Sequence, residues 1–165
     1  MIKKIFVFGD SIAFGGSDYE YGGWVVRLKN YFSKTGQFCH VFNLAVSGQN
    51  SRDILPRIEA EVLSRMNRKE ESLILICVPI NDIRGKGKAD ADPDISFEDF
   101  KGIIKQYHQI GIKCAGNIVF VGMTRVVEKK TNPWQKVLDR RIVCFKNDDI
   151  SKYDDFVESY CNKER

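Results

Sequence analysis

The stretch "KKIFVFGDSIAFGG", residues 3–16, decides the fold class. Its apolar residues 5–8 run without interruption into Gly9, Asp10 and Ser11. A short apolar run that ends in turn-forming residues is typical of a strand buried on both faces, as in a parallel sheet. The same turn places a serine hydroxyl at the mouth of the strand, where it is either an ordinary turn residue or a nucleophile.

The rest of the chain repeats this alternation of strand and helix. Strands are predicted at residues 2–8, 38–46, 73–78 and 117–122, and helices at 23–33, from Ser51, from Ser96 and at 149–162. This order predicts a single domain, residues 1–165, with a parallel sheet covered on both faces. Right-handed crossovers then give a doubly wound, three-layer α/β/α fold of the flavodoxin-like type, with strand order 2-1-3-4. A long loop is expected between the fourth strand and the last helix.

Composition excludes several classes of protein. The 165 residues are 43% hydrophobic and 29% charged, which is typical of a globular domain. The net charge of +4 is spread among 22 acidic residues without a basic block, so no nucleic-acid partner is expected. No signal-peptide pattern or membrane-length apolar run is present, which predicts a cytoplasmic protein without a membrane partner. Five dispersed cysteines fit neither a zinc site nor a disulfide framework, and no cofactor or metal is expected.

Polar residues follow three successive predicted strands. Ser11 follows the first, Gly48 the second and Asn81 the third. Because ligands bind at the carboxyl ends of the strands in such folds, we expect the three to share one crevice. A serine hydroxyl attacks an ester carbonyl, and the resulting oxyanion needs hydrogen-bond donors. The backbone N–H groups of Ser11 and Gly48 and the side-chain amide of Asn81 supply them, and a glycine at position 48 admits a close ligand.

Further residues are predicted around this crevice. Asp10, Tyr21 and Asp82 are predicted on its substrate side, and Asp10 is also expected to accept hydrogen bonds from neighbouring N–H groups. An Asx turn is the alternative role of the Asn81-Asp82 pair. Asp154 and Asp155 are interpreted as solvated surface. The aromatic candidates for the cleft are Tyr19, Tyr21, Trp24 and Trp134, although Trp24 also suits the core.

Three blocks in order resemble the SGNH hydrolases, also called GDSL esterases/lipases. They are "FVFGDSIAFG", "NLAVSGQNSRD" and "VPIND", and the resemblance extends from residue 2 to about residue 160. It implies an ester hydrolase that acts on a small ester through an acyl-serine, with Ser11 as nucleophile and Gly48 and Asn81 as oxyanion donors. The alternatives are a non-catalytic binding module built on the same fold and a flavodoxin-like phosphate binder. The absence of a phosphate loop after the first strand argues against the latter.

The chain departs from the family pattern in two ways. Pro79 stands where the third block usually has glycine, and no Asp-x-x-His block supplies a general base. The only histidines, His40 and His108, are predicted at the far end of the sheet, so weak or no activity is expected. Without the family's fifth strand, residues 117–122 form an edge that is apolar throughout. Such an edge favours pairing with a second copy of the chain, unless the last helix, whose apolar face would also lack part of its partner, covers it.

Overall fold

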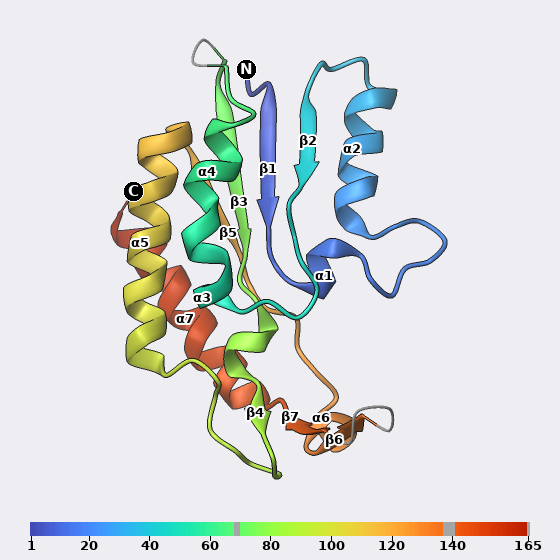
Figure 1. Cartoon of the computed structure of the whole chain (residues 1–165), viewed down its shortest axis with the longest axis vertical. Helices are drawn as coiled ribbons and strands as arrows, with labels where there is room; N and C mark the ends of the chain where they lie inside the picture. The colour runs from blue at the N-terminus through green and yellow to red at the C-terminus, as the bar shows by residue number, and fades with distance from the viewer. Residues whose placement is uncertain (68–69, 137–140, 165) are drawn as a thin grey trace.

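The computed structural model describes residues 1–67, 70–136 and 141–164. Its central sheet has four strands in the order β2-β1-β3-β5, and every neighbouring pair is parallel. The strands are β1 (Lys4–Phe8), β2 (His40–Asn43), β3 (Ser72–Cys77) and β5 (Ile118–Val121). The predicted α/β class and strand order are confirmed (Figure 1).

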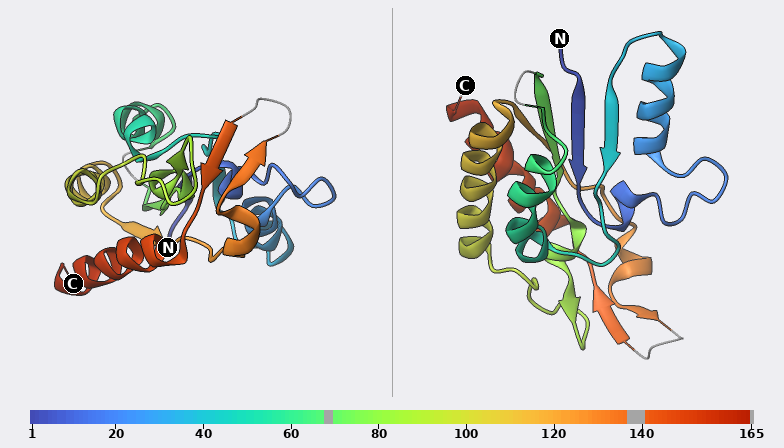
Figure 2. Two further views of the ribbon diagram at one scale, coloured as in Figure 1. Left: turned by 90° about the horizontal axis from the view of Figure 1, so that it is seen from below. Right: turned by 45° about the horizontal axis from the view of Figure 1, so that its top comes forward.

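Helices cover both faces of this sheet, because successive side chains of its strands point to opposite sides. In β1, Ile5 and Val7 pack toward α2 (Trp24–Lys34), whereas Phe6 and Phe8 pack toward the other layer. That layer contains α4 (Ile58–Leu63), α5 (Phe97–Ala115) and α7 (Asn147–Lys163). Figure 2 shows α2 on one side of the sheet and α4 and α5 on the other. The result is the expected three-layer arrangement.

Two local predictions need correction. The helix predicted from Ser51 is divided into α3 (Ser51–Ile54), a 3₁₀ turn η1 (Leu55–Arg57) and α4. Pro56 explains the break, since proline cannot donate the backbone hydrogen bond that a continuous α-helix requires. A short helix, α1 (Ser11–Phe14), also follows β1 directly and is absent from the predicted helices.

The segment expected to be a long loop instead forms most of a small antiparallel sheet. Its strands are β4 (Gly85–Lys86), β7 (Arg141–Cys144) and β6 (Trp134–Lys136), in that order, and α6 (Glu128–Thr131) precedes β6. Val143 and Phe145 join this small sheet to the main core. In Figure 1 the small sheet lies beyond the carboxyl ends of the parallel strands, which is the end that should bind a ligand.

The last helix finds a partner that the sequence did not reveal. α7 buries Ile150, Tyr153 and Val157 in the core cluster that includes α5, so the prediction that its apolar face would lack part of its partner is wrong. Among the described residues, β5 pairs with β3 alone, and Val119 and Val121 are 46% and 39% exposed. No helix in the described part of the chain is both long enough and apolar enough to cross a membrane.

Candidate active site

The turn after β1 is shaped by Gly9 and Asp10. A Cβ on Gly9 would lie 2.9 Å from the Cβ atoms of Ala13 and Cys77, so only glycine allows α1 to pack this closely against β3. Asp10 caps α1, since its carboxylate accepts a hydrogen bond from the backbone N–H of Ile12 at 2.9 Å. Ser11 is therefore the first residue of α1, and it is exposed at the carboxyl end of the sheet.

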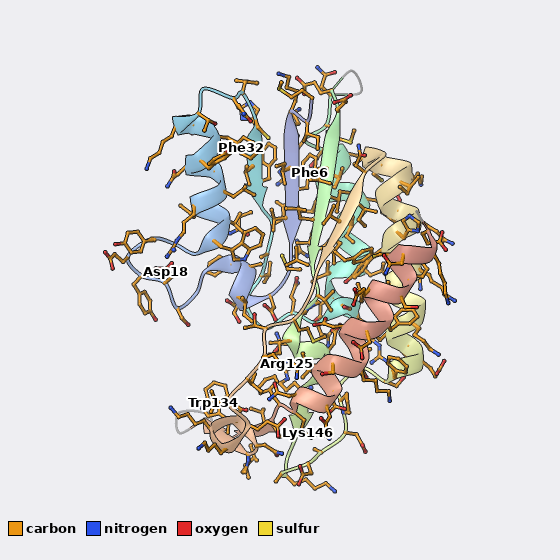
Figure 3. The ribbon with its side chains drawn as sticks, turned by 180° about the vertical axis from the view of Figure 1, so that it is seen from behind. Phe6, Asp18, Phe32, Arg125, Trp134 and Lys146 are labelled. Carbon is orange, nitrogen blue, oxygen red and sulfur yellow. The ribbon has the colours of Figure 1, made fainter. Side chains whose placement is uncertain are left out.

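Ser11, Gly48 and Asn81 line one cavity of about 660 Å³. The three residues come from the loops after β1, β2 and β3, so the structure brings them together at the sheet edge where the sequence predicted them. The opposite wall comes from α6 and the small sheet and includes Lys130 and Trp134. Figure 3 shows Trp134 beyond the carboxyl ends of the parallel strands.

Two backbone donors at this cavity have no hydrogen-bond partner among the described residues. Within the described residues, neither Ser11 nor Gly48 donates a backbone hydrogen bond. Ser11 has a free N–H because it stands at the start of a helix. Gly48 has a φ of +85°, a conformation that side chains disfavour, while a Cβ there would meet no atom within 4 Å. Its backbone conformation, rather than crowding within the protein, is thus the reason for glycine.

The carboxamide of Asn81 is held in one orientation. Its Oδ1 accepts a hydrogen bond from Arg84 Nη1 at 3.1 Å, and a guanidinium group can only donate. Its Nδ2 must therefore face the other way, where it donates to the carbonyl oxygen of Gln49 at 2.9 Å and to Asp10 Oδ2 at 3.4 Å. These contacts take the place of the Asx turn considered for Asn81. Of the two hydrogen bonds that Nδ2 donates, the one to Asp10 is longer and therefore weaker.

Asp10 and Asp82 are buried and tie loops together, so the prediction of direct substrate contact is not supported for either. Asp10 is 2% exposed, accepts a hydrogen bond from Ile80 N at 3.0 Å and lines a different cavity. Burial raises its pKa, although its backbone hydrogen bonds oppose this change. Asp82 is fully buried and accepts hydrogen bonds from Ser51 N and Oγ at 2.7 and 2.5 Å. Burial raises the pKa of Asp82 to about 7.

The other predicted aromatic residues lie away from the cavity. Tyr21 is 55% exposed, and its ring packs under the Arg27 guanidinium at 5.0 Å, so it does not line the site as predicted. Tyr19 is exposed, and Trp24 packs against the α2 core. Only Trp134 of the aromatic candidates reaches the cavity.

The interpretation of Asp154 as solvated surface is also wrong. The carboxylate of Asp154 is half-buried and accepts a hydrogen bond from the backbone N–H of Met123 at 3.0 Å. It therefore connects α7 to the carboxyl end of β5. Asp155, its neighbour in sequence, is exposed as expected.

No histidine or carboxylate lies beside Ser11 in the described part of the chain. The Ser11 hydroxyl forms no hydrogen bond with those residues, and no histidine, aspartate or glutamate is among the cavity lining. His40 pairs in register with Lys4, so about 13 Å of strand separates it from the carboxyl end. His108 Nδ1 is hydrogen-bonded to the Tyr160 hydroxyl at 2.9 Å and lines another cavity. The described residues also contain no His, Cys, Asp and Glu cluster suited to a metal.

Solved structures share the fold at low sequence identity. A lipase/acylhydrolase from Enterococcus faecalis has a TM-score of 0.62 and 21% identity, over 96% of this chain and 70% of that chain. The acetyl xylan esterase Axe2 from Geobacillus stearothermophilus, in a variant form, has a TM-score of 0.66 and 15% identity, over 98% and 72%. TesA, with a TM-score of 0.60 and 20% identity, is matched over 74% of this chain and only 61% of its own.

Comparison with curated protein sequences finds no match. The family description "GDSL-like Lipase/Acylhydrolase family", in contrast, fits residues 7–164, which is nearly the whole chain. The structural neighbours carry the same α/β fold. By the extent of this match, the chain belongs to the GDSL-like lipase/acylhydrolase family.

Proposed function

We propose that the chain is an SGNH-type ester hydrolase that forms an acyl-enzyme on Ser11. One observation carries the proposal: an exposed serine shares a cavity of about 660 Å³ with a buried carboxamide and with two backbone N–H groups that have no partner among the described residues. Unpaired donors beside a nucleophile are what a tetrahedral intermediate of acyl transfer requires. The cavity volume suits a small-molecule ester.

In the proposed reaction, Ser11 Oγ forms a bond to the carbonyl carbon of the ester. The carbonyl oxygen then carries the negative charge, and the N–H groups of Ser11 and Gly48 donate to it. The carboxamide of Asn81 contributes a third donor if Nδ2 gives up its long contact with Asp10. Collapse of the intermediate breaks the ester C–O bond, and the leaving alkoxide takes a proton from solvent to become the alcohol. Water then attacks the acyl carbon, which releases the carboxylic acid and restores the Ser11 hydroxyl.

The proton of the Ser11 hydroxyl must leave during this reaction. Because no described residue is hydrogen-bonded to the hydroxyl and no described histidine or carboxylate lines the cavity, we expect solvent to accept the proton and turnover to be weak. In a serine hydrolase, loss of the histidine lowers kcat by about 10⁶, whereas the remaining oxyanion hole and binding still give about 10³ over water. A low Ser11-dependent rate is thus expected.

The test is hydrolysis of p-nitrophenyl acetate by the wild-type chain and Ser11→Ala, with and without imidazole as an external base. Imidazole should raise the rate of the wild type above that of Ser11→Ala plus the same imidazole. Strong turnover without imidazole that disappears in Ser11→Ala would show that a base exists after all. Equal rates for both proteins under every condition would reject Ser11 as the nucleophile.

The second candidate is a non-catalytic binding module, and the lack of a histidine or carboxylate beside Ser11 among the described residues favours it. A binding module would bind a ligand saturably in the Ser11 cavity. Imidazole would then change the rate of ester hydrolysis equally in wild type and Ser11→Ala. The same two proteins therefore discriminate between the candidates.

A further inference from the structure

Two cationic side chains, and no acidic one among the described residues, line the cavity that contains Ser11. Arg84 and Lys130 both line it, and no aspartate or glutamate does so among the described residues. The remaining lining is largely apolar and includes Trp134, Val143 and Phe145. In a largely apolar ligand site, a few charged side chains fix the orientation of the ligand and determine its specificity. These two cations therefore indicate the class of substrate.

The positive charge at Arg84 is only partly compensated. Asp94 accepts hydrogen bonds from Arg84 Nη2 at 3.2 Å and from Lys86 Nζ at 2.7 Å. Burial opposes ionisation of Asp94, yet these two hydrogen bonds outweigh it and hold its pKa below the usual value. Among these three side chains, one ionised carboxylate therefore serves two cations, which leaves a net positive charge on the group. The buried Arg84 Nε, moreover, has no acceptor within the described ranges.

Lys130 supplies a second positive charge from the opposite wall. It belongs to α6, is exposed, and its ammonium forms neither an ion pair nor a hydrogen bond with the part of the chain that the structure describes. Trp134 follows shortly after it and lines the same cavity. The wall formed by α6 and the small sheet thus combines an apolar surface with an unpaired ammonium group.

We propose that the ester substrate carries an anionic group, a carboxylate or a phosphate, which binds Lys130 on the Arg84 side of the cavity while its apolar part contacts Trp134. The proposal rests on the proposed function for one element only, the placing of the ester at Ser11. A cationic substrate would meet like charges here, and a neutral one could accept a hydrogen bond from the Lys130 ammonium but would gain no charge–charge attraction. The anion therefore sets the specificity of the site.

Binding of three non-activated esters tests this inference. Monomethyl succinate carries a carboxylate, methyl phosphonoacetate carries a phosphonate, and methyl levulinate is a neutral analogue of the first. The indole N–H signals of Trp134 and Trp24 are followed by NMR, with Trp134→Phe used to assign them. Both anionic esters should shift the Trp134 signal saturably and leave Trp24 nearly unchanged, and the tighter of the two identifies the preferred anion.

The matched variants are Lys130→Met and Lys129→Met, because Lys129 is the exposed neighbour that does not line the cavity. Lys130→Met should weaken the binding of the anionic esters by about fivefold, while Lys129→Met and methyl levulinate binding should change little. Added salt should weaken the binding of the anionic esters but not that of methyl levulinate. The dispersion of the NMR spectrum reports whether each variant is folded.

Several results would overturn the inference: no saturable Trp134 shift with either anionic ester, equal affinity for the neutral ester, or an unchanged affinity in Lys130→Met. The binding measurement does not depend on catalysis. Selective binding of the anions that persists in Ser11→Ala, together with a failed imidazole experiment, would therefore reject the proposed hydrolase while supporting the anionic ligand.

Discussion

Asp82→Asn should stabilise the fold more at neutral and alkaline pH than at acid pH. Asp82 is fully buried, and burial is the main reason that its pKa rises from 3.8 to about 7. The two hydrogen bonds from Ser51 favour the carboxylate but offset burial only in part, and the nearby charges of Asp10 and Asp94 raise the pKa further. The folded protein therefore holds a proton on Asp82 over a pH range in which the unfolded chain has released it.

The sign and size of the effect follow from this difference. The unfolded Asp82 loses its proton near pH 3.8, so from there to about pH 7 rising pH favours the unfolded state. Since one pKa unit corresponds to about 1.4 kcal/mol, the complete effect is about 4 kcal/mol, of which about 2–3 kcal/mol falls between about pH 5 and about pH 8. Above about pH 7 this loss of folding stability is complete and no longer changes with pH. This is a large share of the 5–15 kcal/mol or so that stabilises a typical domain.

The measurement is urea unfolding of wild type and Asp82→Asn at about pH 5 and about pH 8. Asparagine has the same shape, and it can accept from Ser51 N while donating to Ser51 Oγ. The free energy of unfolding of the variant, relative to that of wild type, should rise by about 2–3 kcal/mol between these two pH values. Asp155→Asn, at an exposed position of α7, is the control and should show no such gain. A stability difference between wild type and Asp82→Asn that is equal at both pH values would refute the reasoning.

Three further predictions concern the elements around the site. Asp154→Ala removes the acceptor of a backbone N–H at the end of β5 and should lower the free energy of unfolding by about 1–3 kcal/mol, against less than about 0.5 kcal/mol for Asp155→Ala; equal losses in urea unfolding would contradict it. Arg84→Met removes the donor that orients the Asn81 carboxamide, so the side-chain NH₂ signals of Asn81 should shift and broaden in NMR spectra, and unchanged signals would count against this. If the β5 edge pairs with a second copy, Val119→Lys should weaken a dimer seen by light scattering, whereas a wild-type monomer at all concentrations would exclude the pairing.

The sequence was sufficient for the parallel sheet and its principal helices. Apolar runs such as residues 73–78 and the helical spacing of Phe100, Ile103, Ile104 and Tyr107 are strong local signals, and the structure buries these helical positions. The small antiparallel sheet gives no comparable signal. Its strands have two to four residues, which is too few to show the alternation of apolar and polar residues that identifies a strand. In addition, β4 lies far from β7 in sequence. Their pairing depends on tertiary contacts that a local pattern does not contain.

For the candidate site, the sequence placed residues at strand ends but did not determine the direction of their side chains. Asn81 and Asp82 are adjacent in the turn η2 (Ile80–Ile83), yet Asn81 lines the cavity and Asp82 is enclosed with Ser51. Tyr21 is close to Ser11 in sequence, but its loop carries it to the surface. The sequence did not indicate that Lys130 lines the cavity, because Lys130 stands among other charged residues in a segment that was expected to be a loop.

The buried polar residues of the three motifs explain how the donors of the cavity are held in place. Asp10 accepts from Ile80 N, so it joins the loop after β1 to the loop after β3. Asn81 donates to the carbonyl oxygen of Gln49, and the carboxyl of Asp82 binds Ser51, so both join the loop after β3 to the loop after β2.

These bonds connect the loops that carry Ser11 and Gly48 through the loop that carries Asn81. Hydrogen-bond donors stabilise a developing charge best when they are fixed before the charge appears, because no reorganisation is then needed. The proposed reaction therefore uses the motif residues in two ways: Ser11 and Gly48 face the ester, whereas Asp10 and Asp82 hold the loops that position them. Replacing either residue with alanine, which removes the hydrogen-bonding group altogether, should consequently disturb the geometry of the backbone donors, even though neither side chain touches the cavity that contains Ser11.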